Sequence, residues 1–88
     1  MKDGKKWILV VEDEHRLRRF LKDYFGIKGY GVLEAEDGEE AVEKFYNYNA
    51  MIDLVLLDIM LPKMDGLEVL KEIRKNSDVA VIMLTAKG

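Results

Sequence analysis

Short apolar runs alternate with amphipathic stretches along this chain. Between the runs, apolar residues recur at spacings of three and four, which predicts helices beginning after Glu14, Asp37 and Asp65. The order strand, helix, strand, helix, strand, helix, strand is typical of βαβ units around a parallel sheet. The sequence therefore predicts one α/β domain, with helices on both faces of the sheet if the strand order reverses near the first strand. The predicted strands occupy residues 7–11, 30–36, 53–57 and 79–84.

The predicted helices have recognisable starts and ends. Asp37 with Glu40, and Asp65 with Glu68, have the spacing of a capping box. We expect Gly26 and Gly29 to stop the first helix and residues 47–49 to end the second. The apolar faces expected to be buried are Leu17, Phe20, Leu21, Tyr24 and Phe25 in the first helix, Ala41, Val42 and Phe45 in the second, and Leu67, Leu70 and Ile73 in the third.

Composition narrows the class of protein. A length of 88 residues predicts a single domain spanning 1–88. A net charge of −3 gives no basic surface for direct contact with nucleic acid. The chain has no cysteine and no apolar leader after Met1, which predicts a cytoplasmic protein, and its apolar runs are too short to span a membrane.

Acidic residues follow two of the predicted strands. Glu12 and Asp13 end the first strand and Asp58 ends the third, at the edge where α/β sheets bind ligands. Carboxylates held close together repel one another unless a cation lies between them. Mg²⁺ prefers oxygen ligands of this kind. We predict that Asp13 and Asp58 bind Mg²⁺ directly, that Glu12 acts through water, and that Met60 contributes its backbone carbonyl.

Asp58 is also a candidate nucleophile. With Mg²⁺ in place its carboxylate can attack phosphorus, because phosphoryl transfer requires mainly positioning and neutralised oxygens. The product is an aspartyl phosphate. Thr85 follows the fourth predicted strand, where its hydroxyl can bond a phosphoryl oxygen and move when one arrives. Such a movement predicts a switch.

Three segments together resemble the receiver domain of bacterial response regulators. The resemblance covers essentially the whole chain and implies a flavodoxin-like sheet with strand order 2-1-3-4. It also implies that Asp58 accepts phosphate from a sensor histidine kinase, that Glu12 and Asp13 form the family's acidic pair, and that Thr85 is its switch hydroxyl. The segments are VVEDE at 10–14, LLDIMLPKMDG at 56–66 and MLTAK at 83–87.

The chain departs from the family at its carboxyl end. Receivers usually have five βα units, whereas this chain stops three residues after Thr85, so we expect an incomplete βαβαβαβ fold lacking the last helix, strand and helix. The family's phosphate-binding lysine ends the fifth strand, and Lys87 is too close to Thr85 to match it. We therefore expect impaired phosphorylation, and self-association, such as a homodimer, through the exposed fourth strand.

Other functions are open to different degrees. The serious alternative is a self-associating structural fragment that keeps the acidic pocket but has no signalling output. A haloacid-dehalogenase-like phosphatase needs a second acid where this chain has Met60, so we expect no enzyme beyond a module that catalyses its own phosphorylation and dephosphorylation. Neither G-x-G-x-x-G nor G-x-x-x-x-G-K-[ST] occurs. We interpret His15, beside several arginines at a helix start, as a solvated surface residue.

Overall fold

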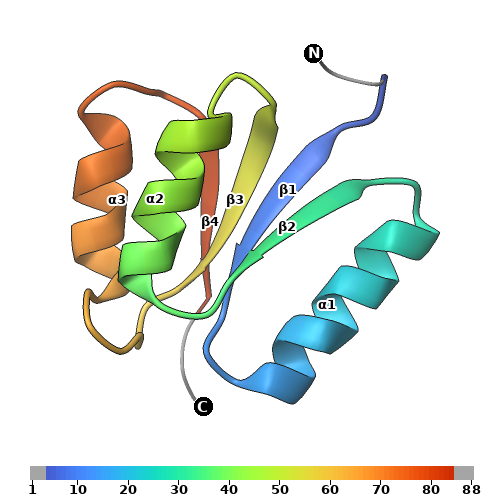
Figure 1. The fold of residues 1–88 in the computed structure, drawn as a ribbon, viewed down its shortest axis with the longest axis horizontal. Helices are drawn as coiled ribbons and strands as arrows, with labels where there is room; N and C mark the ends of the chain where they lie inside the picture. Colours follow the sequence, from blue (N-terminus) through green and yellow to red (C-terminus); the bar gives the residue numbers. More distant parts are fainter. Residues whose placement is uncertain (1–3, 85–88) are drawn as a thin grey trace.

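A computed structural model describes residues 4–84 of the chain. In this part, four strands alternate with three helices, as predicted (Figure 1). Thr85 and Lys87 lie outside the described residues. The elements are β1 (Trp7–Val11), α1 (His15–Ile27), β2 (Gly31–Ala35), α2 (Gly38–Tyr48), β3 (Ile52–Asp58), α3 (Gly66–Arg74) and β4 (Ala80–Leu84).

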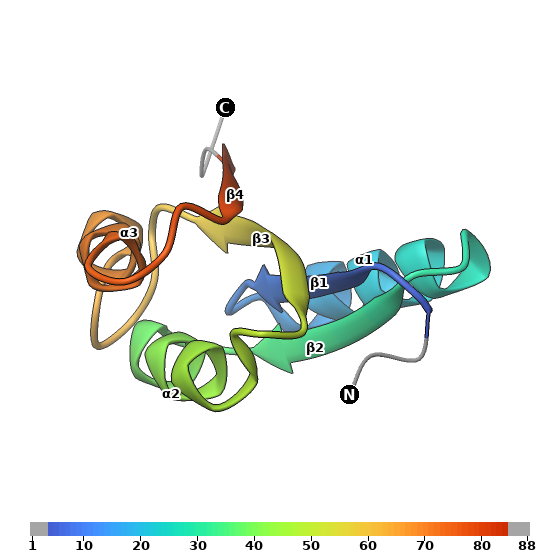
Figure 2. The ribbon, with the colours of Figure 1, turned by 90° about the horizontal axis from the view of Figure 1, so that it is seen from above.

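The strands form one parallel sheet in the order β2-β1-β3-β4, which confirms the predicted topology. The order reverses at β1, which pairs with both β2 and β3. Figure 2 shows α1 on one face of the sheet and α2 and α3 on the other. The reversal places the carboxyl ends of β1 and β3 side by side, where a doubly wound fold binds its ligands.

Helix caps follow the predicted residues, with one difference. Asp65 and Glu68 form a complete capping box at the start of α3. Asp37 caps α2 by accepting the Glu40 N–H at 2.8 Å. The Glu40 carboxylate, however, accepts the N–H of Glu36 at 2.8 Å instead of that of Asp37, so the second predicted box is not reciprocal.

The end of α1 was predicted partly wrongly. Gly26 lies inside the helix, which continues to Ile27. Gly29 has φ of +96°, a conformation that glycine adopts without the cost a side chain would add. Its position outside the helix accounts for the turn into β2. Of the two predicted glycines, only Gly29 therefore lies at the end of the helix, directly after the C-cap residue Lys28.

The larger hydrophobic core lies between the sheet and the pair α2 and α3. Alternate residues of β1 and β3 point to this face, since successive strand side chains face opposite sides. The predicted stripe of α2 is present, with Ala41 and Phe45 buried. The ten buried members of this core are Leu9, Val11, Ala35, Ala41, Phe45, Ile52, Val55, Leu57, Val69 and Ile73.

The predicted buried face of α3 is wrong at Leu67, which is 58% exposed, whereas Val69 is fully buried. Two residues turn an α-helix by about 200°, so Val69 and Leu67 face nearly opposite directions. The start of α3, where Gly66 packs against the end of β3, fixes which of the two is inside. Leu70 is partly buried and Ile73 is buried, as predicted.

The other face of the sheet has a smaller core beneath α1. Its buried members are Ile8, Val10 and Leu56, and from α1 only Leu21 and Phe25 pack against them. The prediction that the whole apolar stripe of α1 is buried is wrong. Leu17 is 42% exposed, Phe20 61% and Tyr24 46%. A single helix covers less of this face than two helices cover of the other.

Candidate metal centre

The end of β1 brings two carboxylates to the edge of the sheet. The Glu12 side chain is buried, at 4% exposure, and Asp13 beside it is exposed. Strand pairing continues through Glu12, whose N–H donates to the carbonyl of Ala35 at 3.0 Å. The Glu14 N–H in turn donates to Glu12 Oε2 at 3.0 Å. The buried acid is therefore held at both its backbone and its carboxylate.

The end of β3 supplies the third carboxylate. Asp58 is 6% exposed, and its Oδ1 accepts the N–H of Met60 at 3.2 Å. A Cβ on Gly66 would lie 2.5 Å from the Asp58 carbonyl oxygen, so only glycine allows the start of α3 to approach this closely. The next residue, Ile59, donates its N–H to the Leu84 carbonyl at 3.2 Å. This bond ties the acidic strand end to β4.

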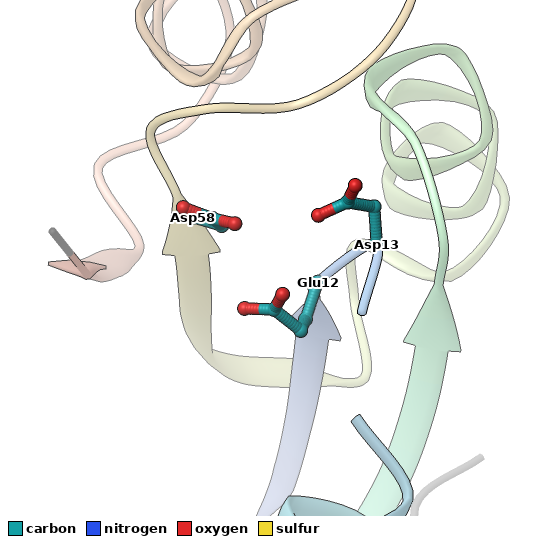
Figure 3. Close-up of side chains that lie close together, drawn as sticks. All are labelled: Glu12, Asp13 and Asp58. Carbon is teal, nitrogen blue, oxygen red and sulfur yellow. The ribbon is translucent and has the colours of Figure 1, made fainter. Parts of the chain in front are cut away.

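The three carboxylates converge. Glu12, Asp13 and Asp58 each offer an oxygen, and these oxygens all lie within 4.8 Å of one another. Figure 3 shows the side chains pointing toward a common space from the ends of β1 and β3. Three hard oxygen donors at this separation match the ligands that Mg²⁺ prefers. The donor set present in the chain therefore fits a divalent cation.

Electrostatics at the cluster favour proton or cation uptake. Burial raises the pKa of the Glu12 carboxyl above its ordinary value, the Glu14 N–H acts in the opposite direction, and the charges of Asp58 and Asp13 raise it further. A buried carboxylate beside two others is costly to keep charged. A divalent cation removes this cost without a proton.

A cavity of about 680 Å³ opens beside the cluster. Its lining combines four acidic and four apolar residues. Met60 is 65% exposed and its side chain lines the cavity. The role of the Met60 carbonyl as a metal ligand stays a prediction, as does the role of Thr85. The cavity is lined by Glu12, Asp13, Glu14, Leu17, Leu21, Asp58, Met60 and Leu84.

The sequence-based interpretation missed Arg18. It lies among the charged residues at the start of α1, yet its side chain is only 11% exposed. Its Nη1 donates to the Glu12 carbonyl at 2.8 Å. The available signal was its position on the first turn of a helix that starts immediately after the acidic pair. His15 is exposed, as expected, and its Nδ1 lies 3.2 Å from Arg18 Nη2.

The sheet order and the acidic pocket define a class: a doubly wound, flavodoxin-like α/β domain with a candidate cation site at the point where the strand order reverses. The response regulator receiver domain family matches residues 8–88. The chain belongs to this family. Receiver domains are signalling modules of two-component systems, and they bind Mg²⁺ at an acidic pocket.

Relatives in sequence are longer regulators. The chain is 50% identical over 86 residues to the probable transcriptional regulator ycf27 of Guillardia theta, covering 98% of this chain and 33% of that protein. It is 49% identical over 81 residues to the transcriptional regulatory protein ResD of Bacillus subtilis, covering 92% of this chain and 33% of that protein. The chain thus spans about a third of the length of these relatives.

Solved structures agree on the fold. The response regulator TrrA of Thermotoga maritima, in complex with Mg²⁺ and BeF, is 49% identical, with a TM-score of 0.85 over 94% of this chain and 71% of that chain. A second structure, of histidine kinase ThkA in complex with TrrA, matches with a TM-score of 0.84 and 49% identity over the same shares of the two chains. In residues 4–84 no helix is long and apolar enough to cross a membrane.

Proposed function

We propose that Asp58 accepts a phosphoryl group from a sensor histidine kinase, with Mg²⁺ held by Glu12, Asp13, Asp58 and the Met60 carbonyl. The observation that supports this most strongly is the convergence of three carboxylates within 4.8 Å at the ends of two adjacent strands. The similar protein TrrA binds Mg²⁺ and a histidine kinase. Family membership supports the same role for this chain.

Each residue has a distinct part in the transfer. Mg²⁺, when bound, neutralises the phosphoryl oxygens and the acidic cluster. Asp58 Oδ1 accepts the Met60 N–H, which orients the carboxylate and leaves Oδ2 as the attacking atom. As the new oxygen to phosphorus bond forms, the bond from phosphorus to the kinase imidazole nitrogen breaks, and that nitrogen keeps the electron pair. Thr85 then bonds a phosphoryl oxygen and reports the modification.

The proposal includes catalysis of the chain's own phosphorylation and dephosphorylation, since the same pocket can position a small phosphodonor or a water molecule. It also includes a cytoplasmic location, in keeping with the absence of cysteine. Binding of nucleic acid by this domain is no part of it, because a net charge of −3 opposes contact with phosphate backbones.

Intact-mass spectrometry tests the transfer. The chain is incubated with Mg²⁺ and acetyl phosphate, beside Asp58→Asn and, as a matched control, Asp78→Asn, which alters an exposed residue before β4. We expect one phosphoryl adduct in the parent chain and in Asp78→Asn, and none in Asp58→Asn. An adduct that survives in Asp58→Asn, or a folded parent chain that takes up no phosphate, contradicts the proposal.

A second candidate function is self-association through β4, as a homodimer without signalling output. In the described part of the chain β4 pairs only with β3, carries no charged residue, and leaves Ile82 50% exposed. An uncharged strand edge is a template for pairing with a second copy. Light scattering of the parent chain and Ile82→Lys tests this. A concentration-dependent dimer that Ile82→Lys disperses supports self-association, and a monomer at all concentrations contradicts it.

A further inference from the structure

The backbone at Glu12 is fixed from two directions. Its N–H belongs to the sheet, through the 3.0 Å bond to the Ala35 carbonyl. Its carbonyl oxygen accepts a hydrogen bond from Arg18 Nη1 at 2.8 Å. This carbonyl belongs to the peptide group that joins Glu12 to Asp13. Since a peptide group is planar, fixing the carbonyl fixes the orientation of the bond that leads into Asp13.

Arg18 reaches this carbonyl because of its place in α1. Its N–H donates to Glu14 at 3.0 Å in the first turn of the helix. Helical side chains lean toward the amino end, so a long side chain here lies back over the loop that precedes the helix. Glu34 of β2 holds the guanidinium in this direction, with its Oε1 at 3.2 Å from Arg18 Nε. The side chain is thus anchored between helix, strand and loop.

Asp13 depends on this anchoring more than its neighbours do. Glu12 is buried and accepts the Glu14 N–H, and Asp58 accepts the Met60 N–H. Asp13 is exposed, and within residues 4–84 no donor forms a hydrogen bond to its carboxylate. Its position relative to the other two acids is therefore set by the backbone that carries it.

We infer that Arg18 is a positioning residue for the cation site: by fixing the peptide group between Glu12 and Asp13, it holds the Asp13 carboxylate where it can share a divalent cation with Asp58. The inference rests on the proposed Mg²⁺ site. Arg18 is not among the residues that line the cavity beside the acidic cluster. Its guanidinium offers several donors in a rigid fork, which one ammonium group cannot replace.

The test compares four proteins: the parent chain, Arg18→Met, Arg18→Lys and Arg19→Met. Arg19 is the neighbouring arginine, exposed on α1, so Arg19→Met changes the net charge by the same amount without touching the loop. Mg²⁺ dissociation constants are measured by calorimetry well below each unfolding temperature, and thermal unfolding without Mg²⁺ gives the stability of each protein. Residues that orient metal ligands typically alter affinity by about 10- to 100-fold.

We expect Arg18→Met and Arg18→Lys to weaken Mg²⁺ binding by about tenfold, and Arg19→Met to leave it unchanged. Arg18→Lys keeps the charge and most of the stem, so it carries the test if Arg18→Met does not fold. An Arg18→Lys protein that binds Mg²⁺ as tightly as the parent chain overturns the inference, because charge or packing alone is then sufficient. Affinities that follow the net charge, with Arg19→Met as weak as Arg18→Met, also overturn it.

Failure of the proposed function gives a different result. A folded parent chain that binds no Mg²⁺ overturns the cation site and the role of Arg18 with it. A parent chain that binds Mg²⁺ and is phosphorylated on Asp58, beside Arg18 variants of unchanged affinity, leaves the proposed function intact and overturns only the positioning role.

Discussion

The two faces of the sheet differ in how completely they are covered. Beneath α2 and α3 lies a core of ten buried residues, whereas beneath α1 only three residues are buried. No residue of α1 is itself buried. Burial of apolar surface is the main favourable term in folding, so the half with α2 and α3 contributes most of the stability. α1 is held by a few apolar contacts and by the polar bonds of Arg18.

The acidic pocket lies on the boundary between these two regions. Glu12 and Asp13 lead into α1, and Asp58 leads through a short loop into α3. Asp58 is therefore connected to the well-packed half of the molecule, and Glu12 and Asp13 are connected to the loosely packed half. Local stability varies across a structure in the same way as packing does. The comparison predicts that matched substitutions have unequal effects in the two halves.

The largest difference is expected for isoleucine in the two helices. Ile73 of α3 is 1% exposed and Ile27 of α1 is 85% exposed. We expect Ile73→Ala to lower the free energy of unfolding by about 3 kcal/mol, because it removes buried methylenes and leaves a cavity. Ile27→Ala should change it by less than about 0.5 kcal/mol. Urea unfolding measures both, and equal losses contradict the comparison.

The second prediction compares two glycines, one in α2 and one in α1. A Cβ at Gly38, the first residue of α2, would lie 2.0 Å from the Met64 carbonyl oxygen, whereas one at Gly26 in α1 meets no atom within 4 Å. We expect Gly38→Ala to cost about 2 kcal/mol by forcing the loop after Asp58 away from α2. Gly26→Ala should stabilise by about 0.5 kcal/mol through higher helix propensity. Urea unfolding gives the denaturant midpoint of each variant. If both midpoints shift in the same direction, the predicted difference between the two glycines is wrong.

The third prediction concerns the pocket at the boundary. Burial raises the pKa of the Glu12 carboxyl in the folded protein. The protonated carboxyl therefore gives its full contribution to stability below the ordinary pKa of glutamate, and this contribution is lost as pH rises through the pKa of the folded state. Without metal, Glu12→Gln should therefore be more stable than the parent chain at pH 7, by roughly 1 kcal/mol, and equal to it near pH 4.

Unfolding curves across this pH range, without Mg²⁺, check the Glu12 prediction. Glu43→Gln is the control, because Glu43 is exposed on α2. It should follow the pH dependence of the parent chain. A Glu12→Gln protein that loses stability at pH 7 would show that the cluster is held by favourable interactions of the charged acid.

The last contrast, no larger than the effect at Glu12, is between two lysines. Lys63, in the loop before α3, has φ of +68°, whereas Lys28 at the end of α1 has φ of −77°. Glycine relieves the strain at the first position and only adds chain entropy at the second. Lys63 also forms an ion pair with Asp37 at 3.6 Å, in which the Lys63 side chain is 59% exposed and that of Asp37 12%, so solvent screening at the lysine keeps its contribution small. Lys63→Gly should thus be more stable than Lys28→Gly by about 1 kcal/mol, and thermal unfolding of both compares them.

Much of the fold was predictable because the periodicity and caps act locally. The start of every helix and the burial of Ala41 and Phe45 follow from spacing and from the residues at the turns, whereas the strand order was implied by the resemblance to receiver domains. Leu67 and Tyr24 were predicted wrongly because burial depends on which neighbouring element covers a helix face. Spacing along one helix carries no information about that cover.

The candidate site was predictable in part for a similar reason. The convergence of Glu12, Asp13 and Asp58 follows once adjacent parallel strands end in acids. The contact between Arg18 and the Glu12 carbonyl could not be read from a charge pattern, in which buried and solvated arginines look alike. The close approach of Gly66 to Asp58 likewise requires the path of the backbone.

The strand order has a consequence for the timing of synthesis. The pocket takes its acids from Glu12, Asp13 and Asp58, and the strands that carry them are already neighbours when β3 docks against β1. A nascent chain can therefore assemble the acidic cluster before β4 has emerged from the ribosome. From that moment until β4 covers the open side of β3, the repelling carboxylates and an uncovered strand edge coexist.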